Sequence, residues 1–148
     1  MQPVSSFPYR KDAASEILRV PPHSLEAEQA VLGGLMLDNA TWDQVADCLD
    51  ENDFYRNDHR LIFRAVRRLA ENSKPFDLLT LAEWLENNKK LEDAGGFAYL
   101  GVLARDTPSA ANVRAYANII RERAIRRELI RTATEIADSA YNPKGRDS

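Results

Sequence analysis

Residues 21–39 read PPHSLEAEQAVLGGLMLDN, a helix-start signal that runs into an apolar segment with two adjacent glycines. The second proline disfavours helix at the residue before it, and Ser24 is a favoured N-cap. We therefore predict a first helix that starts after Ser24 and ends near Leu37. Because glycine inside a helix costs about 1 kcal/mol relative to alanine, Gly33 and Gly34 indicate close packing of this helix in a core.

Four short helices are predicted between Leu37 and residue 106. Capping boxes at Thr41–Gln44 and Thr80–Glu83 start two of them, Asn57 or Asp58 caps another, and Gly95 opens the last. The helix after Asp58 is expected to bury Leu61, Ile62, Ala65, Val66 and Leu69 and to expose Arg60, Arg64, Arg67 and Arg68. No strand pattern competes with these signals, so the predicted fold class is all-α.

The last third of the chain has no glycine or proline from Ser109 to Asn142, which favours a long helical element. Its apolar residues form two stripes that are out of phase. The first stripe is Val113, Tyr116, Ala117 and Ile120, and the second is Ile125, Leu129, Ala133, Ile136 and Ala140. This pattern fits either a helical hairpin that folds back near residues 123–127 or one long kinked helix.

These signals divide the chain into four predicted parts. Residues 1–20 form a flexible N-terminal arm, residues 21–106 a small helical head, residues 107–142 a hairpin or long helix for dimerisation, and residues 143–148 the start of a linker. Two apolar stripes expose more surface than a small head can cover. The pattern therefore favours self-association, most simply as a C2 dimer.

Composition limits the possible function classes. The 148 residues are 44% hydrophobic, enough for one core, and no apolar stretch approaches the roughly 20 residues of a membrane span. The N-terminus has no secretory signal, so we expect a cytoplasmic protein without a membrane partner. Cys48, His23 and His59 are too few soft ligands for zinc, and His59 is expected to be half-exposed and bonded to a loop carbonyl.

Charge is unevenly distributed, although the net value of −3 gives no electrostatic footprint for tight binding to nucleic acid. Acidic residues concentrate between positions 38 and 58, and arginines between positions 105 and 131. These are either two solvated faces or complementary surfaces in an oligomer.

No catalytic, cofactor-binding or metal-binding set is predicted in this chain. Residues 96–101 have only the glycine spacing of a phosphate loop, because Val102 and Leu103 stand where lysine and a hydroxyl residue are needed. Residues 77–88 faintly resemble half of a helix-turn-helix, but Glu83 and Trp84 are poorly suited to base contacts. A stand-alone helical DNA-binding regulator is therefore the alternative function.

Nine blocks of the sequence resemble the N-terminal domain of the bacterial replicative DNA helicase of the DnaB type, in the same order. They are residues 21–39, 53–55, 59–60, 62–63, 77–83, 95–100, 107–112, 116–117 and 119–124. The resemblance implies an all-helical head and a hairpin that pairs into dimers, with three dimers forming a collar on a hexameric ring. It also implies docking of the primase C-terminal domain and a response to a helicase-loading factor.

In this family ATP and magnesium act in a RecA-like domain beyond the linker, where DNA is translocated and unwound at the replication fork. The resemblance therefore implies that this chain alone has no enzymatic activity. Together with the two stripes, it predicts a dimer and primase surface that combines apolar residues with an arginine rim. The apolar residues are Tyr116, Ile119, Ile120, Ile125, Leu129 and Ile130, and the rim is Arg123, Arg126 and Arg127. The alternative for each is that it fills the chain's own core.

Overall fold

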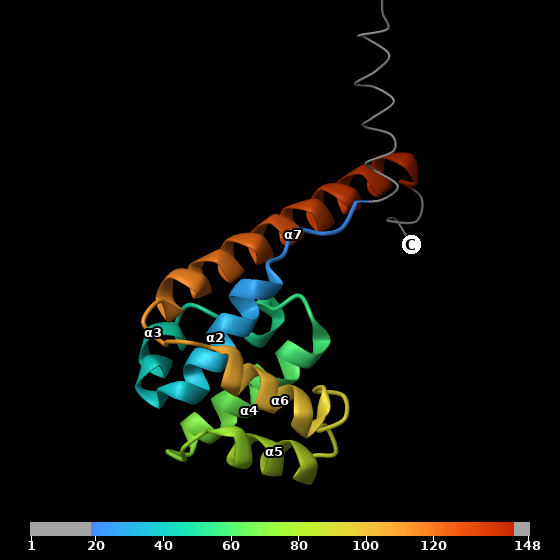
Figure 1. Ribbon diagram of the computed structural model, residues 1–148. Coiled ribbons are helices and arrows are strands. Elements are labelled where there is room, and N and C mark those ends of the chain that lie inside the picture. The colour runs from blue at the N-terminus through green and yellow to red at the C-terminus, as the bar shows by residue number, and fades with distance from the viewer. Residues whose placement is uncertain (1–18, 144–148) are drawn as a thin grey trace, which may run out of the picture.

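The computed structural model describes residues 19–143, which form helices and contain no strand, so the all-α prediction is confirmed. The elements are α2 (Leu25–Leu37), η1 (Asn39–Thr41), α3 (Trp42–Val45), η2 (Glu51–Asp53), α4 (Asn57–Glu71), α5 (Leu78–Asn87), α6 (Gly96–Asp106) and α7 (Val113–Tyr141). Elements α2 to α6 gather into a head, from which α7 extends (Figure 1). Residues 1–18 of the predicted arm and residues 144–148 of the predicted linker lie outside the described residues.

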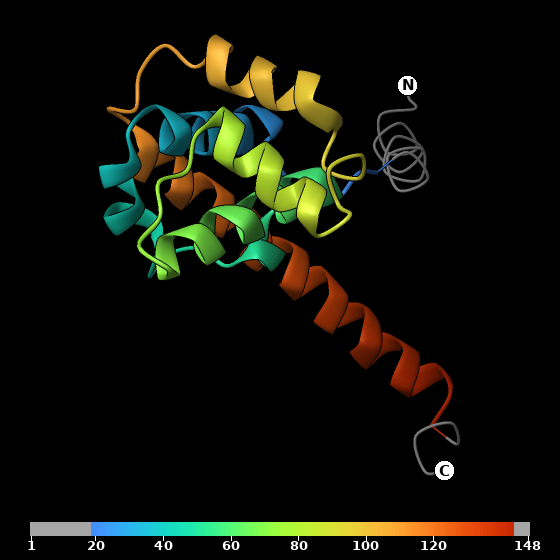
Figure 2. The same ribbon diagram turned by 90° about the horizontal axis from the view of Figure 1, so that it is seen from below.

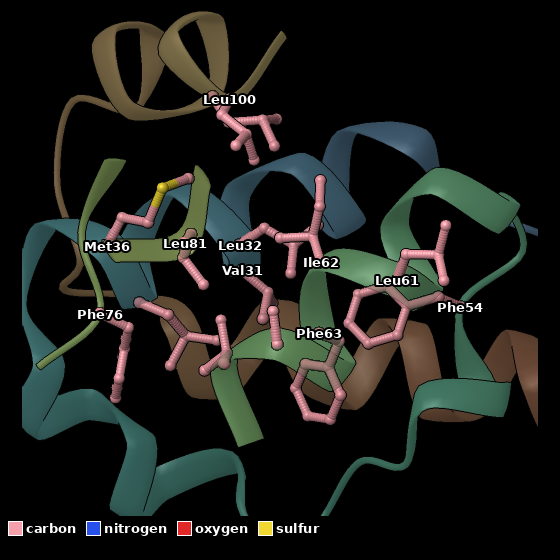
Figure 3. Packing of buried hydrophobic residues seen from close by; sticks show 14 of the residues in the cluster. Val31, Leu32, Met36, Phe54, Leu61, Ile62, Phe63, Phe76, Leu81 and Leu100 are labelled. Carbon is pink, nitrogen blue, oxygen red and sulfur yellow. The ribbon is translucent and has the colours of Figure 1, made fainter. Parts of the chain in front are cut away.

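Helix α2 lies at the centre of the head and is buried on most of its circumference, as expected for a helix with apolar residues all round. Ser24 is its N-cap, as predicted, and its hydroxyl accepts a hydrogen bond from the backbone N–H of Ala27 at 3.2 Å. Val31 and Leu32 have no exposed surface and lie in the core with Ile62 of α4 (Figure 3).

The two glycines of α2 allow the segment around the α6–α7 connection to approach closely, which confirms the packing prediction. A Cβ added at Gly33 would lie 1.8 Å from Thr107 Oγ1 and 2.6 Å from the carbonyl oxygen of Leu103. A Cβ at Gly34 would lie 2.5 Å from Cγ2 of Val113. All three distances are shorter than a real Cβ tolerates, so this contact requires glycine at both positions.

Helix α4 buries the predicted apolar face. The buried residues include Leu61, Ile62, Ala65, Val66 and Leu69. Two of the four arginines expected to face water bond loop carbonyls. Arg60 Nε donates to the carbonyl of Phe54 at 2.8 Å, and Arg67 lies 5.0 Å above the ring of Trp42 and donates to the carbonyl of Leu49 at 2.9 Å. A guanidinium can stack on an aromatic face while its N–H groups bond loop carbonyls, which periodicity alone does not reveal.

Three helices start differently from the capping prediction: α3 and α4 have no side-chain cap, and α5 is capped by an earlier residue. The Thr41 hydroxyl donates to the Asp38 carbonyl at 2.7 Å within η1, and no side chain caps α3. Helix α5 starts three residues earlier than the Thr80 box predicted, because Asp77 is the N-cap and Thr80 completes its capping box. Helix α4 begins at Asn57 without a side-chain cap.

A buried polar network joins α2, α4 and α6. Contrary to the prediction of a half-exposed histidine, His59 is fully buried, with Nδ1 2.7 Å from Glu28 Oε1 and Nε2 2.6 Å from the Tyr99 hydroxyl. The second carboxylate oxygen of Glu28 accepts from the backbone N–H of Tyr55 at 2.7 Å, and the Tyr99 hydroxyl accepts from Gln29 at 3.2 Å.

One assignment of donors and acceptors around the His59 imidazole satisfies this network. Its Nδ1–H then donates to the carboxylate of Glu28, and its Nε2 accepts from the hydroxyl of Tyr99. Burial raises the pKa of Tyr99, which keeps that hydroxyl available as a donor. Each buried polar side chain in the network therefore has a partner, as such groups require in a low-dielectric core.

Helix α7 is one continuous helix of 29 residues, about 44 Å long, so the hairpin alternative does not occur within residues 113–141. Its first half buries Val113, Ala117 and Ile120 in the head core. The head therefore extends past the predicted boundary at residue 106. The second half leaves the head, as the view from below shows (Figure 2).

Two glycine-to-alanine substitutions test the packing of α2. Gly33→Ala should destabilise the head by about 1–3 kcal/mol, because the new methyl group meets the Leu103 carbonyl and Thr107. Gly101→Ala is the matched control, since a Cβ there meets nothing within 4 Å and alanine should stabilise α6 by up to about 1 kcal/mol. Urea unfolding monitored by circular dichroism measures both, and equal effects at the two sites would refute the crowding argument.

Candidate partner-binding surface

The distal half of α7 carries large apolar side chains that the head does not cover. Leu129 is 64% exposed and Ile136 is 66% exposed, and Ile125 and Ile130 are each nearly half exposed. The distal half of α7 projects beyond the head (Figure 1). An apolar surface of this kind on a single helix is typical of an interface.

Three of these side chains share one side of α7 with two alanines, and we call this set the distal stripe. It consists of Ile125, Leu129, Ala133, Ile136 and Ala140. Successive residues of an α-helix are about 100° apart, so these five fall within roughly one quarter of the helix circumference. The head-facing residues Ala117, Ile120 and Ala124 lie on the opposite side of the helix. The phase break in the sequence therefore separates a face buried in the head from an exposed face.

Ion pairs occupy part of the remaining surface of the distal half. Arg131 donates to Glu135 at 2.6 Å and also pairs with Glu128, and Arg126 lies 3.6 Å from Glu122. Arg131 lowers the pKa of Glu128, and Glu128 raises the pKa of Arg131. These exposed pairs keep the charged side of α7 in water and leave the distal stripe free of charge.

Arg127 fastens α7 to two other segments of the head. Its guanidinium donates to the Pro22 carbonyl at 2.7 Å and to the Asp53 carbonyl at 2.6 Å, and it lies 5.6 Å above the ring of Tyr55. The ring of His23 also stacks on that of Tyr55, with the two centroids 4.1 Å apart. Partial burial lowers the pKa of Arg127, but arginine stays charged in proteins.

The sequence-predicted surface residues separate into two groups in the structure. Ile120 is only 1% exposed and belongs to the head core, which is a correction to the prediction. Arg127 is also corrected, because it bonds head carbonyls instead of forming a free rim. Tyr116 and Ile119 are partly buried and pack against the core.

The other predicted residues lie on the surface. Ile125, Leu129 and Ile130 are exposed apolar residues, Arg126 is exposed, and Arg123 is half-buried and pairs with Glu122. The predicted surface set omitted Ile136, which is 66% exposed, although the second apolar stripe of the sequence already contained it.

The described residues offer no site for the nucleotide or metal of a motor. Residues 96–101 form the first turns of α6 with Leu100 in the core, so they do not fit a phosphate-binding loop. Within residues 19–143 no group of three His, Cys, Asp or Glu side chains could hold a metal ion. No helix in this part of the chain is both long and apolar enough to cross a membrane.

The described residues thus form a small helical head and one long helix whose distal half is uncovered. A family model described as the DnaB-like helicase N-terminal domain matches residues 20–122. The chain therefore belongs to the family of DnaB-like helicase N-terminal domains, as the sequence resemblance predicted.

Curated relatives agree with this assignment. The chain is 48% identical over 136 residues to the replicative DNA helicase DnaB of Haemophilus influenzae, covering 92% of this chain and 29% of that protein. It is 47% identical over 123 residues to DnaB of Geobacillus stearothermophilus, covering 83% of this chain and 27% of the relative. The chain thus spans less than a third of the length of these relatives.

Solved structures show the same fold. The N-terminal domain of DnaB helicase from Mycobacterium tuberculosis matches with a TM-score of 0.81 and 36% identity, covering 83% of this chain and 85% of that one. The N-terminal domain of DnaB helicase from Helicobacter pylori, described together with its interactions with primase, matches with a TM-score of 0.65 and 25% identity, covering 78% and 90%.

A comparison of two neighbouring arginines tests the role of Arg127. Arg127→Ala should lower the free energy of unfolding by about 1.5–3 kcal/mol, because two carbonyls lose a charged donor. Arg126→Ala should change it by less than about 0.5 kcal/mol, since Arg126 is exposed and pairs only with Glu122. Amide hydrogen exchange should also accelerate at His23 and Ser24, which follow Pro22, in Arg127→Ala alone. Unchanged exchange there would show that the bonds to Arg127 do not hold this segment.

Proposed function

We propose that this chain is the N-terminal, non-catalytic domain of a hexameric replicative DNA helicase that unwinds DNA at the replication fork. The domain self-associates through the distal stripe of α7 and docks the C-terminal domain of primase. The observation that supports this most directly is the uncovered stripe, because Leu129 and Ile136 point away from the head and need a neighbour.

The remaining functions of the motor belong to parts outside this chain. ATP and magnesium would be bound by a RecA-like domain, which would also contact DNA, and a helicase-loading factor would act on the assembled ring in the cytoplasm. This division is consistent with a chain that spans less than a third of its relatives and offers no phosphate-binding loop in the described residues.

The alternative of a stand-alone DNA-binding regulator has less support. The exposed residues of α5 include Leu79 and Glu83, which are not suited to reading bases. Two of the α7 arginines that could contact phosphates are already paired with acids: Arg121 pairs with Asp53 at 3.0 Å, and Arg131 pairs with Glu135. The net charge of −3 also opposes tight binding to DNA.

A glutamate substituted into the distal stripe should weaken self-association. Leu129→Glu and Ile136→Glu should each weaken it at least ~10-fold, because a glutamate would be buried without a partner at the interface. Thr134→Glu is the matched control, since Thr134 is exposed on the same turns but about 140° from the centre of the stripe. Sedimentation velocity measures the change, and a dimer that persists in both stripe variants would contradict the assignment.

Docking of primase is tested with purified proteins. The chain should co-elute with the C-terminal domain of primase from the same organism, and it should show negligible affinity for a labelled DNA oligonucleotide. Steeply salt-dependent DNA binding without primase binding would instead support the regulator.

A further inference from the structure

A groove separate from the distal stripe runs between the segment that precedes α2 and the side of α7. Its walls are apolar, and three arginines surround it. The lining residues are Arg19, Val20, Pro21, Arg127, Ile130 and Arg131. Val20 is 57% exposed and Ile130 is 47% exposed, so both side chains are accessible.

The groove and the distal stripe occupy different sides of α7. Ile130 follows Leu129 directly, and this places its side chain about 100° further around the helix. Arg127, one turn before Ile130, faces the same segment of the head through its bond to the Pro22 carbonyl. A partner in the groove and a second copy on the stripe could therefore be bound by the same helix.

The positive charge around the groove is only partly balanced. Within residues 19–143 Arg127 bonds two carbonyl oxygens and forms no ion pair. The two acids that act on it most, Glu28 and Asp53, bond His59 and Arg121 respectively. No ion pair involves Arg19 in the described part of the chain, whereas Arg131 pairs with Glu128 and Glu135.

We infer that this groove binds an acidic amphipathic helix of a partner protein. Leucine or isoleucine side chains would cover Val20 and Ile130, and a glutamate or aspartate would accept hydrogen bonds from the flanking guanidinium groups. Apolar walls favour such a helix over the phosphate backbone of a nucleic acid, which would leave Val20 and Ile130 in water. The inference rests on the proposed function of α7 as a partner-binding helix and adds the chemistry of the partner.

The test uses defined peptides and the chain as it stands. Two fluorescein-labelled helical peptides of about 18 residues carry the same leucines, with glutamates in one and lysines in the other. Fluorescence anisotropy should show that the acidic peptide binds at least ~10-fold more tightly than the basic one. Equal binding of the two peptides, or tighter binding of a labelled thymidine oligonucleotide than of the acidic peptide, would overturn the inference.

Two variants locate the binding site. Ile130→Glu and Arg19→Glu place a carboxylate in the groove and should each weaken acidic-peptide binding at least ~10-fold, whereas unchanged binding would overturn the inference. Ile130 is on the surface, so an unchanged thermal midpoint should confirm that Ile130→Glu is folded. Leu129→Glu separates the two proposals: peptide binding that persists after loss of self-association supports both the groove and the stripe.

Discussion

The close contact between α2 and the α6–α7 connection is the constraint on which the rest of the structure depends. Gly33 leaves room for Thr107, whose hydroxyl donates to the Leu103 carbonyl at 2.9 Å at the end of α6. Gly34 leaves room for Val113, the first residue of α7. The position of this contact therefore determines where α6 stops and where α7 begins.

A second constraint holds α6 near its N-terminal end. Tyr99 reaches α2 through Gln29 and α4 through His59, so α6 is held by hydrogen bonds as well as by the apolar side chains of Leu100 and Leu103. Apolar contacts tolerate sliding of one helix over another, whereas a buried network is satisfied in one register only. The network thus gives the head a unique arrangement of its helices.

Sequence patterns predicted the features that depend on local chemistry. The start at Ser24, the end near Leu37 and the buried face of α4 follow from capping and periodicity. The Thr80 capping box failed because Asp77, three residues earlier, is also a good N-cap and competes for the same helix. The pattern could not rank the two caps, since the deciding burial of Leu81 and Leu85 is tertiary.

Tertiary contacts also explain the errors in the candidate site. Ile120 and Ile125 are both apolar residues in one helix, and only the position of the head shows that Ile120 is buried while Ile125 is exposed. Likewise Glu28 lies in the first turn of α2, where the helix dipole favours an acid, but its carboxylate also bonds His59 and the Tyr55 N–H. Residues far apart in sequence meet at these points, so no local signal could identify the partners.

The attachment of α7 at Arg127 has a mechanical consequence. Fourteen residues separate Arg127 from Tyr141, a lever of about 21 Å. A rotation of α7 by about 10° about Arg127 would displace Tyr141 by about 4 Å, which approaches the shift of one helical turn seen when one helix slides past another. A small shift of the carbonyls of Pro22 and Asp53 would thus become a larger displacement at the Tyr141 end of α7.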